Sequence, residues 1–143
     1  LKGRFRLALD LPEGWRAVAN APALEERAGH ARFAETPPIS TYLFTFAAGP
    51  FRVVTKKGES VRLFARRSRL ARARAVAPDL LRLNRAAMDR FARICGHPFP
   101  FAKYDLVLIP DFHYGGMEHA GATFLREDRI LLRHPRSQYW RRR

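Results

Sequence analysis

The chain has 143 residues and carries 27 Lys and Arg against 13 Asp and Glu, a formal net charge of +14. Its hydrophobic content of 47% excludes wholesale disorder, and its length suits one domain of average size or two incomplete ones. No apolar run approaches the roughly 20 residues of a membrane helix, and the single cysteine, Cys95, excludes both an internal disulfide and a zinc site built of cysteines.

The first part of the chain has the pattern of an antiparallel β module. Residues 5–11 alternate apolar and polar side chains, as in a half-buried strand, and residues 21–29 have the composition of a loop. The segment from Thr41 to Ala48 is rich in aromatic and β-branched residues and predicts a buried strand. A hairpin turn is expected at Lys57-Gly58-Glu59. The other strands expected in this part cover residues 15–20, 30–35, 51–55 and 61–65.

The pattern changes near Arg66, where we expect a switch from β to α/β structure and a domain boundary. Apolar residues recur at helical spacing over residues 78–95, with Pro78 suited to a first turn and Gly96 to the position after the helix. Residues 105–109 are a continuous apolar run, typical of a strand covered on both faces. Two further short strands are expected, at residues 122–125 and 130–132.

The two ends of the chain predict a piece of a longer protein. The first expected strand begins almost at residue one, with no initiator methionine and no signal peptide before it. The last residues, Tyr139 to Arg143, carry no capping signal.

The residues best suited to chemistry gather in one loop, from Asp111 to Gly121, directly after the expected buried strand. Paired glycines, Gly115 and Gly116, let another backbone approach and leave peptide groups free to bond a ligand. A carboxylate beside them, Glu118, could receive a cation such as a substrate ammonium. The alternative is a glycine-rich hairpin with solvated polar side chains, and spacing alone slightly favours it.

The same loop prompts a test for a metal site, because His113, Glu118 and His119 lie close together. A zinc-binding helix needs two histidines four residues apart, whereas these two are six apart with glycines between them. Cys95 with His97 fits a core residue at a helix end better than a ligand pair. We therefore expect no metal site within the chain.

Residues 99–112, followed by Gly115-Gly116-Met117-Glu118-His119, resemble the strand and G-x-M-E-N exopeptidase motif of the aminopeptidase N family of zinc metallopeptidases. Several matching segments in the right order make this a specific signal. The other segments that resemble the family are Leu1 to Phe5, Pro38 to Leu43, Ala47 to Phe51 and Gly121 to Glu127.

The resemblance implies an α+β fold in two incomplete parts. Residues 1–66 would be the C-terminal part of an antiparallel, saddle-like β domain. Residues 67–143 would be the start of a thermolysin-like α/β catalytic domain. The implied function is that of a zinc aminopeptidase, which removes N-terminal residues from peptides.

The resemblance also implies a substrate-binding role for five residues. Gly115 and Gly116 would bond the backbone of a peptide substrate, and Met117 would line the pocket for its first side chain. Glu118 would bind the free α-ammonium. His119 stands where the family usually has asparagine, and it adds the prospect of positive charge near the ammonium site.

The zinc-binding motif of the family, H-E-x-x-H, does not occur anywhere in the chain. The zinc ligands, the glutamate that activates water and the oxyanion-stabilising tyrosine are expected after Arg143. The chain is therefore expected to hold no catalytic residue and to be inactive alone, with the rest of the catalytic domain as its partner. Without that partner, an unpaired sheet edge at residues 4–11 and an apolar face predict self-association.

Two other functions stay open. A non-catalytic relative could keep the fold as a scaffold. A small basic nucleic-acid-binding protein would suit the charge, of which residues 61–143 hold +11. It is disfavoured because aromatic residues such as Tyr42, Phe44 and Phe46 are expected at buried strand positions.

The expected localisation is the cytoplasm, because a single cysteine, with no partner for a disulfide, is typical of a reducing compartment.

Overall fold

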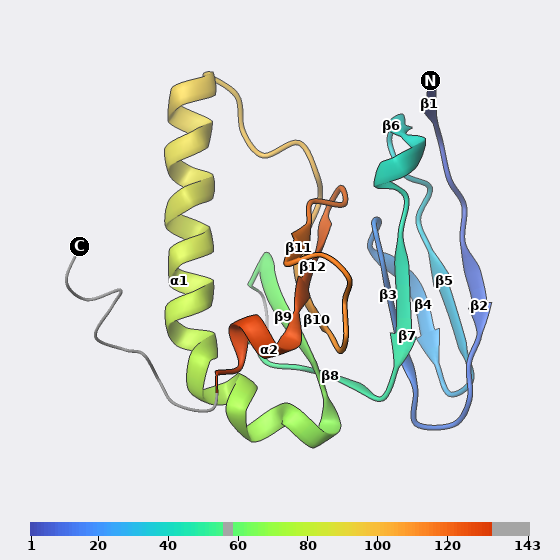
Figure 1. Cartoon of the computed structure of the whole chain (residues 1–143). Coiled ribbons are helices and arrows are strands. Elements are labelled where there is room, and N and C mark those ends of the chain that lie inside the picture. Colours follow the sequence, from blue (N-terminus) through green and yellow to red (C-terminus); the bar gives the residue numbers. More distant parts are fainter. Residues whose placement is uncertain (56–58, 133–143) are drawn as a thin grey trace.

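A computed structural model describes residues 1–55 and 59–132, and they form three layers (Figure 1). A long helix, α1, covers one face of a five-stranded sheet, and the N-terminal strands lie on the other side of that sheet. Within the described residues, no helix is long and apolar enough to cross a membrane. The fold is mostly β-sheet with one long helix, in agreement with the α+β class expected from the sequence.

The N-terminal strands form small antiparallel sheets around a core made largely of alanines. Ala17, Ala19, Ala31 and Phe33 are buried there. The sheets have the orders β2-β5-β4, β3-β7 and β1-β6. Their strands are β1 (Lys2–Gly3), β2 (Ala8–Asp10), β3 (Arg16–Ala19), β4 (Ala23–Arg27), β5 (His30–Phe33), β6 (Ile39–Ser40) and β7 (Phe46–Gly49).

The loop predicted at residues 21–29 is wrong, because β4 occupies most of it and pairs with β5. β4 is an edge strand with mostly exposed side chains, so it shows no apolar alternation. Ion pairs supply the cross-strand contacts: Glu26 lies 2.5 Å from Arg16 and Glu25 lies 3.7 Å from Arg32. Each pair joins side chains of two different strands, so the periodicity within one strand cannot reveal it.

The buried strand predicted from Thr41 to Ala48 is also wrong in its first half. A 3₁₀ turn, η1 (Thr41–Leu43), precedes β7. Tyr42 is 62% exposed and Phe46 is 46% exposed. Phe44 stacks on Phe5, with ring centroids 4.4 Å apart. Two of these three aromatic side chains are therefore exposed. The expectation that they are buried, which disfavoured nucleic-acid binding, is wrong for Tyr42 and Phe46.

The five-stranded sheet has the order β11-β12-β10-β9-β8. The three inner strands are parallel and the two edge strands, β11 and β8, are antiparallel to their neighbours. The strands are β8 (Phe51–Val53), β9 (Val61–Arg66), β10 (Tyr104–Ile109), β11 (Gly116–Met117) and β12 (Ala122–Arg126). The turn predicted at residues 57–59 lies mostly outside the described residues.

The central strand β10 confirms the prediction of a strand covered on both faces. Leu106 and Leu108 pack under α1, whereas Val107 faces the N-terminal layer together with Val18 and Phe51. None of the three β10 side chains is more than 1% exposed. Parallel strands with both faces covered carry continuous apolar runs, and this is why the sequence marks β10 clearly.

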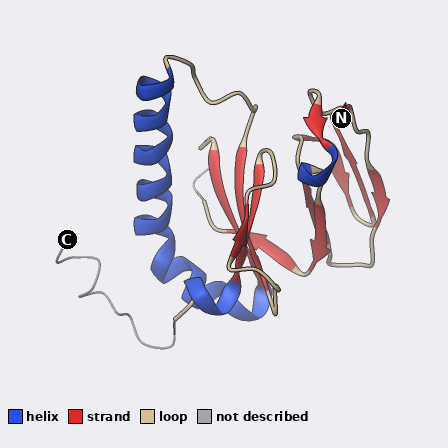
Figure 2. Cartoon of the chain, turned by 45° about the horizontal axis from the view of Figure 1, so that its top comes forward, coloured by secondary structure: helices blue, strands red, loops and turns tan. Residues whose placement is uncertain are grey.

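Helix α1 spans Leu70–Cys95, so it begins well before the predicted start at residue 78. Pro78 lies inside the helix rather than in its first turn. Figures 1 and 2 show α1 bent between a short first part and a longer second part, as expected where proline removes a backbone hydrogen bond. The predicted end is confirmed, because Gly96 adopts the left-handed conformation after the last turn, with φ of 63°.

The strand predicted at residues 130–132 is wrong, because the short helix α2 (Glu127–Ile130) follows β12 there. A second short turn, η2 (Arg67–Arg69), leads from β9 into α1. The five-stranded sheet continues across residue 66, since β9 pairs with β8 on one side and with β10, the strand that follows α1, on the other. The division into domains at residues 1–66 and 67–143 remains a prediction.

Candidate functional site

The glycine loop predicted as the site leads into the edge strand β11. In the β11–β12 ladder, Gly116 faces Leu125 and Met117 faces Phe124. The N–H of Arg126 donates to the carbonyl of Gly115 at 3.1 Å. Because bonded and non-bonded pairs alternate in an antiparallel ladder, the N–H and C=O of Gly116 point away from β12. No described strand covers that outer edge.

Directly after β11 lies a short loop that carries Glu118 and His119. The Glu118 side chain is exposed, and those of Met117 and His119 are half-buried. The carbonyl of His119 accepts the N–H of Ala122 at 3.1 Å, so the loop is closed by its own backbone. The exposed carboxylate therefore lies on a short, hydrogen-bonded loop at the edge of the sheet.

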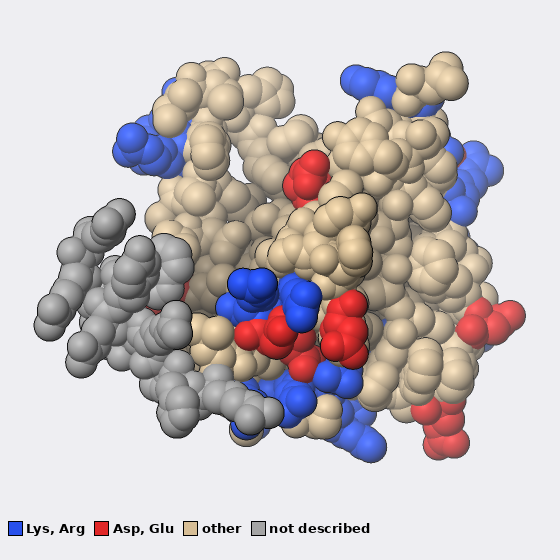
Figure 3. Space-filling model, in the orientation of Figure 1, with Lys and Arg blue, Asp and Glu red and all other residues tan. Residues whose placement is uncertain are grey.

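This loop borders a groove of about 570 Å³ between α1 and the sheet. Figure 3 shows a hollow between the helix and the sheet with mostly uncharged walls, and charged side chains gathered below it. Glu118 and His119 are among the polar groups of the groove, which is otherwise mainly apolar. Its main apolar walls come from Met88, Phe91, Phe99, Phe101 and Tyr104. A carboxylate at the edge of an apolar groove can bind a cation attached to an apolar group.

His119 packs its ring against an aromatic side chain and makes no side-chain hydrogen bond to a described residue through its buried Nδ1. Its ring packs edge-on against Phe124, with centroids 4.8 Å apart. Its Nδ1 is buried and has no hydrogen-bond partner among the described residues. Burial lowers the pKa of His119 below its ordinary value of 6.5, although Glu118 opposes that shift. The ring is therefore mainly neutral at pH 7, which reduces the prospect of positive charge that the sequence raised at this position.

We expect the stability of the protein to fall as the pH is lowered from 6.5, partly through His119. The unfolded chain then binds a proton on this ring more readily than the folded one, so protonation favours unfolding. In His119→Asn this contribution should disappear, and the urea midpoint should depend less on pH between 6.5 and 5. An unchanged pH dependence would contradict the buried, neutral state of the ring. His113→Asn is the control, because that histidine is exposed.

No group of three His, Cys, Asp or Glu side chains within residues 1–55 and 59–132 is arranged to hold a metal ion. His113 is exposed and lies edge-on to Tyr114, with ring centroids 5.2 Å apart. Cys95 is exposed and borders the groove, so the core position expected for it is wrong. Cys95 is the last residue of α1, and its side chain is not covered by other described residues.

Sequence reasoning missed a buried charged cluster under the loop. Lys103 is 7% exposed and Asp105 is fully buried, and their charged atoms lie 2.7 Å apart. Arg62 donates two hydrogen bonds to the same carboxylate, at 2.7 and 2.8 Å. Burial lowers the pKa of Lys103, and the contact with Asp105 opposes that shift. Lys103 and Asp105 lie at the start of the apolar strand β10. The sequence around them gives no sign that these two charged side chains pair with each other and with Arg62.

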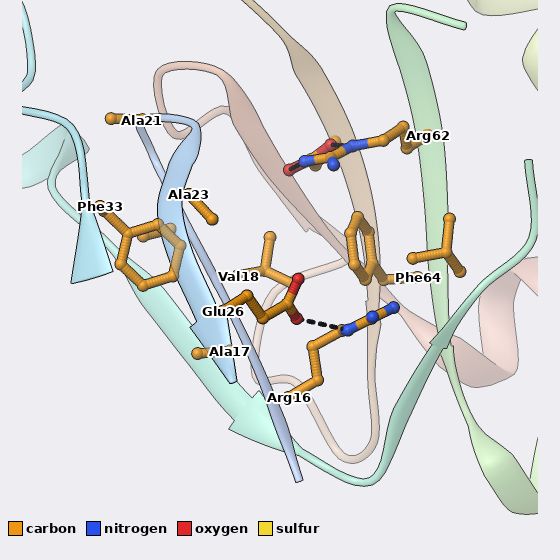
Figure 4. A pocket seen from close by; sticks show the side chains of 12 residues that line it. Arg16, Ala17, Val18, Ala21, Ala23, Glu26, Phe33, Arg62 and Phe64 are labelled. Carbon is orange, nitrogen blue, oxygen red and sulfur yellow. Dashed lines mark hydrogen bonds and ion pairs between the residues drawn. The ribbon is translucent and has the colours of Figure 1, made fainter. Parts of the chain in front are cut away.

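The other side of this cluster opens on a small pocket of about 200 Å³ between the N-terminal strands and the sheet. Figure 4 shows the Arg16–Glu26 pair on one side of the pocket and Arg62 above Phe64. The Arg62 guanidinium carbon lies 5.1 Å from the centroid of that ring. Both arginines already have carboxylate partners, so neither offers an uncompensated charge to a ligand in this pocket.

A second charged cluster joins the ends of β9 and β12. Arg66 donates two hydrogen bonds to Glu127, at 3.0 and 2.8 Å, and Arg69 adds one at 3.1 Å. Burial alone would raise the pKa of Glu127, but the two guanidinium groups lower it overall. The cluster fixes the start of α1 against α2.

Comparisons with known proteins agree with the motif. The peptidase family M1 domain matches residues 81–143. The chain is 33% identical over 137 residues to aminopeptidase N of Streptomyces lividans, and 30% identical over 137 residues to aminopeptidase M1 of Arabidopsis thaliana. It is 26% identical over 150 residues to leucyl aminopeptidase of Saccharolobus solfataricus. The chain is a member of the aminopeptidase N-like family.

The matches cover nearly all of this aminopeptidase N-like chain but only a small part of its relatives. They span 92%, 91% and 97% of the chain and 16%, 15% and 18% of the three relatives named above. The matched M1 domain begins within α1 and includes β10, β11 and β12. The groove and the loop with Glu118 therefore fall mostly inside the matched M1 domain, whereas the N-terminal strands precede it.

Proposed function

We propose that the chain forms part of a zinc aminopeptidase and holds the amino terminus of a peptide substrate. The observation that carries this proposal is the position of Glu118. Its exposed carboxylate follows an uncovered strand edge and lies at an apolar groove. Those features match the three parts of a peptide amino terminus, namely its ammonium, its backbone and its first side chain.

Each part of the site has a distinct task in the proposal. The outward N–H and C=O of Gly116 pair with the substrate backbone, as when a peptide adds a strand to a sheet edge, and the neighbouring Gly115 leaves room for that approach. Glu118 binds the α-ammonium through charge-assisted hydrogen bonds. Met117 and the groove receive the first side chain, and His119, neutral at pH 7, leaves the charge of Glu118 uncompensated.

The described residues do not fit a zinc ion, so no hydrolytic step is assigned to them. In the proposal, the zinc ligands and catalytic residues lie in residues that follow Arg143 in the full-length protein. Residues 1–66 then belong to a saddle-like β domain and residues 67–143 to a thermolysin-like catalytic domain. Cytoplasmic localisation is also part of the proposal.

The test compares leucine anilide with its N-acetyl analogue as substrates of the full-length protein. We expect hydrolysis of the free amine only, because acetylation removes the charge that Glu118 binds. Removal of metal by a chelator should abolish hydrolysis, and zinc should restore it. Equal cleavage of the acetylated substrate would overturn the role of the ammonium. Absence of any hydrolysis in a folded, zinc-loaded protein would favour the alternative, a non-catalytic relative that serves as a scaffold.

A further inference from the structure

Asn20, at the end of β3, is a buried side chain with hydrogen bonds at both ends of its amide. Its Nδ2 donates to the carbonyl of Ala120 at 2.8 Å and to that of Leu43 at 2.8 Å. Its Oδ1 accepts the N–H of Thr45 at 2.7 Å. The side chain is 6% exposed. One amide from the N-terminal layer therefore holds a backbone carbonyl two residues after Glu118.

Lys103 anchors the next carbonyl along the chain. Its Nζ donates to the carbonyl of Gly121 at 3.0 Å and also to the carbonyl of Ala19 in β3. The ion pair with Asp105 keeps the ammonium in place. Asn20 and Lys103 thus hold two successive carbonyls, of Ala120 and Gly121, against the end of one strand.

The backbones also meet directly at this point. A Cβ atom on Gly121 would lie 2.6 Å from the carbonyl oxygen of Asn20. The N–H of Asp105 donates to the carbonyl of Gly121 at 3.0 Å. The loop with Glu118 is therefore held on one side by the β11–β12 ladder and on the other by β3, and β3 belongs to the N-terminal layer.

We propose that Asn20 and Lys103 are positioning residues that hold Glu118 at the distance from the groove that a substrate ammonium requires. The inference rests on the proposed function and extends it to the N-terminal layer. Neither side chain touches the substrate. Each acts through the carbonyls of Ala120 and Gly121, and misplacement of a binding group by about 1 Å can reduce catalysis up to roughly 100-fold.

The test uses Asn20→Asp and Lys103→Met in the full-length protein. Aspartate keeps an oxygen for the N–H of Thr45 but cannot donate to Ala120 or Leu43. Methionine keeps the unbranched stem of Lys103 but ends one atom short of the ammonium nitrogen and has no donors. We expect each change to lower kcat/KM for leucine anilide by about tenfold to 100-fold, mainly through KM. Inhibition by a leucine-derived free amine should weaken in parallel.

Thr36→Val is the matched control. Thr36 is 3% exposed and its Oγ1 accepts the N–H of Phe5 at 3.0 Å, so the valine variant loses a partly buried hydrogen bond of the same layer without touching the loop. It should lower the melting temperature but leave KM unchanged. If Asn20→Asp and Lys103→Met merely behave like Thr36→Val, the inference is overturned.

A double mutant separates this inference from the function on which it rests. In Glu118→Ala, the further change Asn20→Asp should have little additional effect on KM, because the group that it positions is gone. Independent, additive effects would overturn the positioning role while leaving the proposed function intact. No effect of Glu118→Ala alone would overturn the proposed function itself.

Discussion

Replacement of Glu118 by alanine is expected to lower kcat/KM for substrates with a free amino terminus by about 100-fold in the full-length protein. A bound ammonium that loses its carboxylate partner keeps the cost of leaving water without the attraction that offsets it. The Glu118 side chain is exposed, so the fold should tolerate the change. The measurement is steady-state hydrolysis of leucine anilide, together with the zinc content of the purified protein, which should not change.

Two variants sharpen this test. Glu118→Gln keeps the shape and one acceptor oxygen but removes the charge, so a loss close to that of alanine would identify charge as the main contribution. Glu13→Ala removes an exposed glutamate from a distant turn and should leave hydrolysis unchanged. An unaltered kcat/KM in Glu118→Ala would remove the assigned role of this carboxylate.

The largest effect on stability is expected for Gly121→Ala. Gly121 has φ of 68°, a left-handed conformation that disfavours any side chain. The new methyl group would also meet the carbonyl oxygen of Asn20 at 2.6 Å, and that oxygen belongs to backbone. We expect the free energy of unfolding to fall by about 2–4 kcal/mol, since strain and overpacking add. Urea unfolding of the chain, followed by circular dichroism, measures the change.

Gly96→Ala is the control, because it has nearly the same conformation, with φ of 63°, but nothing within 4 Å of the added methyl group. It should cost only about 1 kcal/mol, the conformational part alone. The difference between the free energies of unfolding lost in the two variants measures the effect of the close approach between Asn20, directly after β3, and the loop. Equal losses would mean that this approach is absent in solution.

The parts of the fold that were predicted correctly are those in which local pattern and environment coincide. β10 is covered on both faces by the two layers, so its apolar run was sufficient evidence. The end of α1 was correct because Gly96 adopts the conformation that glycine favours. The five residues of the motif were found through resemblance, and the structure brings Glu118 and His119 to one groove.

The errors have a common physical origin in contacts made between elements, which the local pattern of one element does not reveal. β4 exists because β5 pairs with it, although its own side chains are mostly exposed. The first turns of α1 bury Ala73 and Ala77 against the sheet, and this burial extends the helix ahead of Pro78, where the sequence predicts its start. The edge strand β4 and the start of α1 are therefore hard to predict, because tertiary packing overrides their weak local preferences.

The amino-acid sequence by itself determined the central strand, the end of the long helix and the motif from Gly115 to His119. Each depends on residue types at neighbouring positions. Only the tertiary structure decided that burial lowers the pKa of His119 and that Asn20 and Lys103 anchor the loop with Glu118. Burial and hydrogen bonds between residues as many as 100 positions apart decide these properties, and such contacts form only when the chain has folded.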